Sequence, residues 1–299
     1  MLSNLVQSPE VQQLLGRASG INEPGGDVRL KAILRDLLEA FMTIIEKHDV
    51  SENEFWTAIK FLQDGASELG LIVPGVGLEH FLDLHMDKKD AEQGLTGGTP
   101  RTIEGPLYVE GAPLAEGEDV NLSQDPDEDA ATLHMSGKVI GPDGEAVKGA
   151  ILHVWHANST GFYSHFDPTG VQSPFNNRRR IKLGDDGRYS FRSKMPSGYA
   201  VPPGGATDQL MSALGRHGKR PAHVHFFVEA PGYRTLTTQI NFGDDPFAAS
   251  DFAFGTREGL LPMPTREGDT VHVNFDFRLQ RARFQKEEQF STRPRVRAA

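Results

Sequence analysis

The sequence predicts an α+β protein in which an N-terminal α-helical region is followed by a mainly antiparallel β-sandwich. Two observations support this: apolar residues recur at helical spacing up to about residue 90, and short β-prone runs separated by turn signals follow from residue 133. At 299 residues the chain is long enough for two domains. We expect a helical linker and dimerisation domain at 1–100 and a β-sandwich domain at 101–299.

Helices are expected throughout the first ninety residues. One helix face is formed by apolar residues three or four positions apart, namely Leu30, Ile33, Leu34, Leu37, Leu38, Phe41, Ile44 and Ile45. Ser51 followed by Glu54 is a capping box that predicts the start of the next helix, and Pro74-Gly75 interrupts the pattern before residues 78–82 resume it. Because these helices carry more apolar surface than a monomer needs, we expect them to pack against a second subunit.

Strands are expected in the second part of the chain. Runs rich in β-branched and aromatic residues, bounded by Gly, Pro and Asp, predict strands at 152–155, 189–191, 223–228, 235–242 and 271–277. One helix interrupts them at 207–214, with Thr207 as its N-cap and Gly215 after its end. Short strands at this spacing are typical of a β-sandwich.

Composition and charge exclude several classes of protein. A formal net charge of −10 argues against a nucleic-acid partner, and no apolar run is long enough to cross a bilayer. The first residues lack the pattern of a signal peptide, so a cytoplasmic location is expected. The chain has no cysteine. Thiolate nucleophiles and iron–sulfur clusters are therefore excluded, and any metal must be held by nitrogen and oxygen atoms.

The segment Arg220-Pro221-Ala222-His223-Val224-His225 is the most informative in the chain. In a strand, His223 and His225 lie on the same face and form a potential pair of metal ligands. The alternative is that they are two polar residues on a solvated strand face.

Two tyrosines, Tyr163 and Tyr199, lie in loops flanked by glycine or proline, where a rigid backbone can direct both side chains toward one point. Taken singly, each is more typical of a half-buried aromatic residue. A phenol has a pKa of about 10 and is a good ligand only for a strongly acidic cation, and ferric iron is such a cation.

Together with further segments, these residues resemble the intradiol ring-cleavage dioxygenases, and most of all their catechol-cleaving branch. The segments that carry the resemblance are 98–108, 155–158, 175–179, 215–225, 236–241 and 251–254. They cover most of the chain in the family's order. The resemblance implies a non-haem Fe(III) ion held by Tyr163, Tyr199, His223 and His225. It also implies that Arg220 and Gln239 line the substrate cavity and that Tyr199 leaves the metal to accept a substrate proton.

The resemblance further implies a catalytic β-sandwich that cleaves catechol with O2 between its two hydroxylated carbons. The product would be cis,cis-muconate, as in the β-ketoadipate pathway of aromatic compound catabolism. The implied pocket-lining positions are Leu71, Pro74, Ile103, Pro106, Leu107, Phe252 and Ala253. The alternative for each of these residues is simple core packing. The family also suggests a homodimer formed through the N-terminal helices, with a phospholipid between them.

Other interpretations remain open at this point. Within the family, hydroxyquinol 1,2-dioxygenase or a relative that prefers chloro- or methylcatechols shares the same ligands. Outside it, the chain could be a metal-free binding module, or a zinc hydrolase that uses His223 and His225 with a third histidine or carboxylate. The basic cluster Arg178-Arg179-Arg180 is interpreted as a solvated turn. At Ala206 the chain departs from the proline that relatives commonly have there.

Overall fold

The computed structural model describes residues 5–125, 128–290 and 295–297. The chain forms two compact units, Met1–Ala66 and Ser67–Ala299. The predicted domain boundary differs from this division, because it lies near residue 100, after the last of the N-terminal helices, and not after residue 66. That boundary stays a prediction. No helix within the described ranges is long and apolar enough to span a membrane.

The first unit contains η1 (Leu5–Gln7), α1 (Pro9–Ser19), α2 (Val28–His48) and α3 (Glu52–Asp64). Each α-helix begins at a residue whose side chain accepts a backbone N–H, as helix N-termini require. The predicted capping box of Ser51 and Glu54 is confirmed at α3. α1 and α2 pack together, and Arg35 Nη2 donates to Gln12 Oε1 at 2.6 Å between them.

The apolar faces of α2 and α3 are largely exposed in the single chain. The exposed side chains include Leu30, Ile33, Leu37, Phe41, Ile44, Phe55, Trp56, Ile59 and Leu62. A second subunit that covers them stays a prediction.

Among the described residues of the second unit, three α-helices and two short 3-10 helices, η3 (Ala248–Ser250) and η4 (Gln285–Glu288), accompany the sandwich. A 3-10 turn, η2 (Gly65–Glu68), leads into α4 (Leu69–Gly75), which packs against α6 (Ala206–Ala213). Pro74 lies in the last turn of α4, and Gly77, at φ 79°, precedes the first residue of α5 (Leu78–Glu92). The predicted interruption between two helices is therefore confirmed: it lies at Val76 and Gly77, directly after Pro74-Gly75.

The predicted N-cap of α6 is wrong. The cap position is Gly205, and Thr207 lies in the first turn. The Glu68 carboxylate accepts hydrogen bonds from Ala206 N at 3.1 Å, Thr207 N at 2.8 Å and Thr207 Oγ1 at 2.7 Å. The hydrogen bonds from Thr207 lower the pKa of Glu68. A proline at 206 would lack the amide hydrogen that Ala206 donates.

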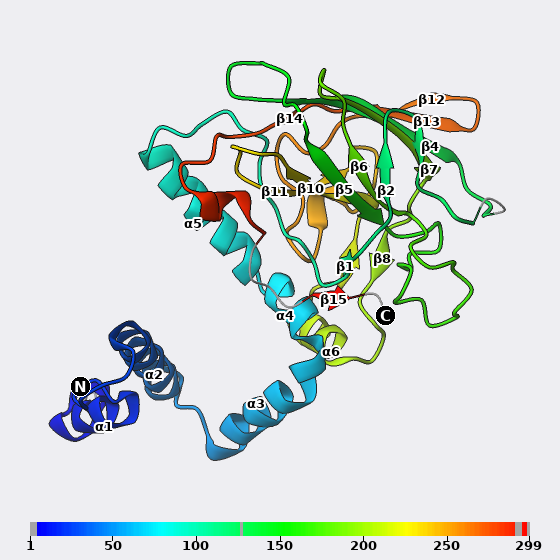
Figure 1. Cartoon of the computed structure of the whole chain (residues 1–299). Coiled ribbons are helices and arrows are strands. Elements are labelled where there is room, and N and C mark those ends of the chain that lie inside the picture. The colour runs from blue at the N-terminus through cyan, green and yellow to red at the C-terminus, as the bar shows by residue number, and fades with distance from the viewer. Residues whose placement is uncertain (1–4, 126–127, 291–294, 298–299) are drawn as a thin grey trace. The chain divides into compact units, whose positions relative to one another are not determined.

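Two sheets form the sandwich (Figure 1). The strands of the first sheet, in spatial order, are β11 (Leu236–Asn241), β10 (His223–Glu229), β5 (Ile151–His156), β6 (Arg178–Lys182) and β2 (Leu114–Glu116). Those of the second are β12 (Thr265–Glu267), β13 (Thr270–Asn274), β4 (Thr132–Ile140), β7 (Arg188–Lys194) and β3 (Val120–Asn121), and β14 (Phe277–Arg278) also pairs with β4. Two short pairs lie outside these sheets, β1 (Val109–Glu110) with β15 (Val296–Arg297), and β8 (Tyr199–Ala200) with β9 (Lys219–Arg220).

The sheets are mixed. Their long central pairs are antiparallel, as is the pair of β12 and β13. In contrast, β2 pairs with β6, β3 with β7, and both β13 and β14 with β4 in parallel. The predicted run 271–277 is split, because Asp276 separates β13 from β14 and its carboxylate accepts Lys138 N at 2.8 Å. The other four predicted strands are confirmed within a few residues.

The hydrophobic core lies between the two sheets. Leu133, Met135 and Phe191 from one sheet pack against Val224 and Phe226 from the other. Because side chains alternate along a strand, this burial directs His223, His225 and Phe227 to the opposite face of β10.

Candidate metal centre and substrate site

The outer face of β10 and its neighbours forms the floor of the candidate site. The strand register places Gln239 of β11 on one side of His225 and Trp155 of β5 on the other. The rings of Trp155 and His225 are stacked, with centroids 4.9 Å apart and an interplanar angle of 6°. Asn241 lies beside His223 in the same ladder. The sheet therefore fixes the orientation of the imidazoles before any ligand binds.

The two imidazoles present a pair of ring nitrogens to one point. His223 Nδ1 donates to the Pro221 carbonyl at 2.7 Å, which leaves the lone pair of Nε2 available. Burial, reinforced by the charge of Arg220, lowers the pKa of His223 to about 3, so the ring is neutral. His223 Nε2 and His225 Nε2 lie 3.1 Å apart. With metal–nitrogen bonds of about 2.1 Å, two ligands at this separation subtend an angle of roughly 95° at one ion.

The two predicted tyrosine ligands lie against this pair. Tyr163 Oη is 3.2 Å from His223 Nε2, and the rings of Tyr163 and Tyr199 are perpendicular with centroids 5.8 Å apart. Burial, and next the neighbouring Tyr199, raises the pKa of Tyr163 well above its ordinary value. A buried phenol of this kind ionises only when a strongly acidic cation binds it.

Local turns bring the tyrosines together. Asn158 Oδ1 accepts the backbone N–H groups of Thr160 at 3.1 Å and Phe162 at 2.9 Å, which fixes the turn that precedes Tyr163. Tyr199 pairs with Arg220 across β8 and β9. Gly161 lies at φ 87°, and a Cβ there would be 3.0 Å from the Cβ of Tyr199. A side chain at position 161 would push the second phenol away.

The donor set of two imidazole nitrogens and two phenol oxygens fits a hard ferric ion. Among the residues that the structure describes, no three His, Asp or Glu side chains are grouped so as to hold a metal ion. The phenols of Tyr163 and Tyr199 lie against His223, whereas a zinc hydrolase needs a third histidine or a carboxylate there. The structure brings the four predicted ligands together, and their role as ligands stays a prediction.

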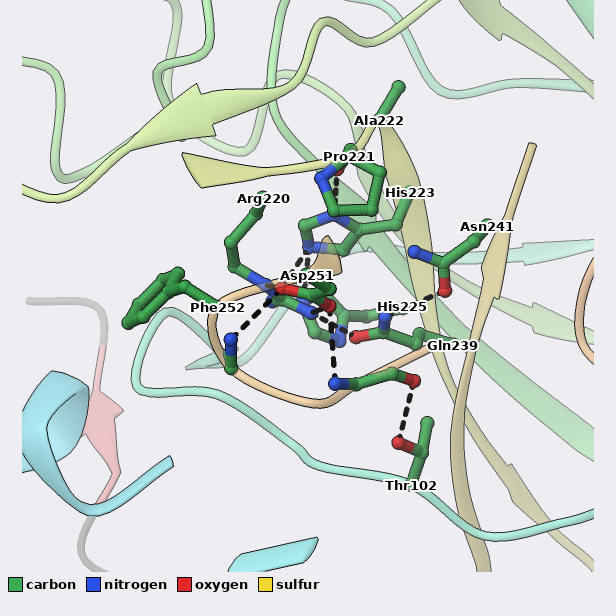
Figure 2. A network of polar contacts seen from close by, with 12 residues as sticks. Thr102, Arg220, Pro221, Ala222, His223, His225, Gln239, Asn241, Asp251 and Phe252 are labelled. Atoms are coloured by element: carbon green, nitrogen blue, oxygen red, sulfur yellow. Dashed lines mark hydrogen bonds and ion pairs between the residues drawn. The ribbon is translucent and has the colours of Figure 1, made fainter. Parts of the chain in front are cut away.

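Arg220 links His223 to a buried polar network that includes Gln239 and Asp251 (Figure 2). Its Nε and Nη2 donate to Asp251 Oδ1 at 3.1 Å and Oδ2 at 3.0 Å, and Nη2 also donates to Gln239 Oε1 at 2.8 Å. Its Nη1 lies 3.1 Å from His223 Nε2 and 3.5 Å from Tyr199 Oη. Burial opposes the charge of Arg220, but Asp251 outweighs it and raises the pKa above its ordinary value. The guanidinium is therefore a permanent cation beside the donor set.

Sequence reasoning missed three residues of this network. Asp251 holds Arg220 and also accepts Ala253 N and Gly255 N, each at 3.1 Å. Asn241 Oδ1 accepts Gln239 Nε2 at 2.8 Å. Gly255 leaves room for the guanidinium of Arg220, since a Cβ at position 255 would be 2.5 Å from Arg220 Nη2. A buried arginine needs a carboxylate as its counter-charge, so a partner for Arg220 could have been expected. The sequence does not identify which carboxylate that partner is.

The predicted pocket-lining positions come from three segments of the second unit. Ile103, Phe252 and Ala253 belong to one apolar cluster, and Leu107 packs against a second cluster that includes Tyr163. α4, which carries Leu71 and Pro74, approaches Pro106 so closely that a Cβ on Gly70 would be 2.9 Å from it. The predicted positions thus gather around one region, while their role as a substrate pocket stays a prediction.

A separate groove of about 1030 Å3 runs along α5 and includes Asp83, Asp87, Arg101 and Arg257 in its lining. None of the four predicted ligands lines it. It is therefore distinct from the candidate metal centre.

The interpretation of the basic cluster as a solvated turn is wrong for Arg178. Its side chain, at the start of β6, is 1% exposed and lies against Tyr163 and Phe166. Burial lowers the pKa of Arg178 to about 10, which leaves it charged at neutral pH. Periodicity does not report tertiary contacts, so the local pattern did not indicate that this one arginine faces inward.

With the geometry established, comparison with known proteins defines the class. A family model described as "Dioxygenase" matches residues 103–281, and one described as "Catechol dioxygenase N terminus" matches residues 27–94. The chain belongs to the intradiol ring-cleavage dioxygenase family that these models describe.

Individual relatives indicate the branch. "Catechol 1,2-dioxygenase 1" of Acinetobacter lwoffii is 50% identical over 88% of this chain and 85% of its own length. The crystal structure of catechol 1,2-dioxygenase from Pseudomonas arvilla C-1 has a TM-score of 0.91 and 44% identity, and covers 98% of both chains. A hydroxyquinol 1,2-dioxygenase from a Rhizobium species is 32% identical over 86% of this chain and 85% of its own. The chain is thus more similar to the catechol enzymes than to this hydroxyquinol enzyme.

Proposed function

We propose that this protein is a non-haem Fe(III) intradiol dioxygenase that cleaves catechol with O2 to give cis,cis-muconate. The observation that carries the proposal is the pair of imidazole nitrogens 3.1 Å apart, with a phenol oxygen 3.2 Å from one of them and the Arg220 guanidinium alongside. Family membership and similarity to catechol 1,2-dioxygenases support it.

Tyr163, Tyr199, His223 and His225 would hold the ion. When bound, ferric iron supplies the Lewis acidity that draws electron density from the catecholate ring. Tyr199 is the more exposed of the two phenols, and Arg220 Nη1 is within 3.5 Å of its oxygen. It is therefore the phenol suited to accept a substrate proton, whereas the buried Tyr163 stays in place.

Arg220 and Gln239 would lie beside the bound substrate. The guanidinium is fixed by Asp251 and Gln239, so it needs no reorganisation to stabilise negative charge on the bound substrate. Ile103, Leu107, Phe252 and the other predicted lining residues offer apolar surface that suits a flat aromatic ring.

Catechol is favoured over hydroxyquinol by the higher identity to catechol enzymes and by the segments 102–107 and 155–158. Relative turnover of the two substrates tests this choice, and a strong preference for hydroxyquinol would overturn it. Acceptance of chloro- and methylcatechols depends on clearances around Leu71, Leu107 and Ala253, and is measured in the same assay.

The central experiment is an anaerobic visible spectrum with iron quantitation. We expect stoichiometric iron and a tyrosinate-to-iron charge-transfer band that changes when catechol is added under nitrogen. Admission of O2 should then give muconate. A colourless protein without iron would favour a metal-free binding module instead.

We also propose a cytoplasmic homodimer formed through the N-terminal helices, with phospholipid between them. The exposed apolar residues of α2 and α3 support the dimer. Native mass spectrometry before and after lipid extraction tests both parts, and a monomer that carries no lipid would contradict them.

A further inference from the structure

We propose that Arg178 is a positioning residue for Tyr163. Its buried guanidinium fixes the backbone next to that tyrosine and places a positive charge over the phenol ring, which weakens electron donation from the phenolate to the metal. This inference rests on the proposed function. It concerns a different guanidinium from that of Arg220, one that lies against the Tyr163 ring and not against His223.

The contacts of Arg178 converge on the residue after Tyr163. Arg178 Nε donates to Ser164 Oγ at 2.9 Å, and Nη2 donates to the Ser164 carbonyl at 3.0 Å. The guanidinium carbon is 5.6 Å from the centroid of the Tyr163 ring. Because two nitrogens of the planar Arg178 guanidinium bind Ser164, the adjacent Tyr163 has little freedom to move.

The turn before β6 directs Arg178 inward. Phe175 and Asn177 have left-handed backbone conformations, at φ 58° and 57°, and Arg178 N donates to the Phe175 carbonyl at 3.0 Å. Ser164 Oγ in turn donates to the Asn176 carbonyl at 2.8 Å. Hydrogen bonds therefore join Ser164 to residues 175–178. Left-handed conformations of non-glycine residues persist only where the surroundings enforce them.

The charge balance distinguishes the two buried arginines. Arg220 has the carboxylate of Asp251 at 3.0 Å, whereas across the described ranges no carboxylate oxygen lies within 4.0 Å of Arg178. A buried cation without an anion is costly, so an offsetting negative charge is expected near it. The anionic form of Tyr163, as a metal ligand, supplies that charge.

The effect of the Arg178 charge on Tyr163 can be measured from the energy of the tyrosinate-to-iron charge-transfer band. A fixed cation near a phenolate holds its electrons more tightly, so a charge-transfer transition from Tyr163 to iron requires more energy. At 5.6 Å, loss of this charge should move the band to longer wavelength by on the order of 20 nm.

The test uses Arg178→Met, which keeps the length but removes the charge, and Arg178→Lys, which keeps the charge but not the fork. The matched control is Arg192→Met, which breaks an exposed ion pair with Asp119 on the other sheet. Iron content and the anaerobic spectrum are recorded for each purified variant. We expect the longer-wavelength shift in Arg178→Met, a smaller shift in Arg178→Lys, and none in Arg192→Met. An iron-loaded Arg178→Met with the wild-type band would overturn the proposal.

If Arg178→Met does not fold, Ser164→Ala keeps the inference testable. It removes the hydroxyl that fixes Nε and leaves the charge, so the band should broaden or shift while iron still binds. A wild-type spectrum in both Ser164→Ala and Arg178→Lys would then refute the inference. Failure of the proposed function is separate, because in that case the wild-type protein itself would lack the iron-dependent band.

Discussion

Replacement of Asp251 by Asn should destabilise the protein strongly. The side chains of Arg220 and Asp251 are 3% and 1% exposed, and two charge-assisted hydrogen bonds join them. Asn has nearly the same shape, so no cavity forms and the loss is electrostatic. Removal of one partner leaves a buried guanidinium without its anion, which costs about 3–5 kcal/mol.

Urea denaturation measures this loss, and the structure offers a matched control. Arg192 and Asp119 form an ion pair whose side chains are 55% and 52% exposed. Asp119→Asn should therefore cost less than about 1 kcal/mol. We expect the urea midpoint of Asp251→Asn to fall by roughly 1 M or more. A midpoint that falls no further than that of Asp119→Asn would refute the reasoning.

The same variant has a defined dependence on pH. Burial opposes the ionisation of Asp251, but Arg220 outweighs it and holds the pKa of this carboxyl below its ordinary value. A lowered pKa stabilises the folded state above the unfolded pKa of about 4, and this contribution is lost as the pH falls. The stability difference between wild type and Asp251→Asn should therefore be largest near neutral pH and shrink below about pH 4.

Three further predictions follow from the site and its surroundings. Gly255→Ala should lower catechol turnover by about 100-fold, because its Cβ would be 2.5 Å from Arg220 Nη2. The control is Gly184→Ala, whose nearest contact would be at 3.5 Å and which should leave turnover unchanged. Equal turnover in the two variants would contradict this prediction. Tyr199→Phe and His223→Ala should each lose most activity through loss of a ligand, and near-normal catechol turnover in either would refute the assignment. Burial, and next Glu79, raises the pKa of Asp83 from 3.8 to about 7, so wild type should lose stability relative to Asp83→Asn as the pH rises between these values. Parallel stability profiles of the two proteins from pH 4 to 8 would exclude that effect.

Periodicity was sufficient for the helices and for most of the sandwich. The alternation of His223, Val224 and His225 correctly placed the imidazoles on one strand face, since the apolar neighbours must be buried. The N-cap of α6 could not be predicted, because its function is supplied by Glu68 from a distant part of the chain. The strand break at Asp276 likewise depends on a contact with Lys138 in a neighbouring strand.

The four ligands were assigned by the resemblance to the intradiol dioxygenases, and residue types that are unusual in their local setting had already drawn attention to them. Two histidines in an apolar run and two tyrosines in rigid loops stand out from the sequence alone. Asp251, Gly255 and Arg178 do not, because an aspartate, a glycine and an arginine are unremarkable until their partners are known. Their parts in the network depend on burial and on pairing between segments that are far apart in the chain.

The alternation along β10 also restricts how such a protein can change. Val224, Phe226 and Val228 are fully buried between the sheets, and His223 and His225 occupy positions that alternate with them along the strand. A shift of the strand by one residue would place imidazoles in the core and turn the valines toward the face that now carries the imidazoles. The packing of the sandwich and the direction of the imidazoles therefore depend on the same strand register, so an insertion or deletion in β10 would disrupt both at once.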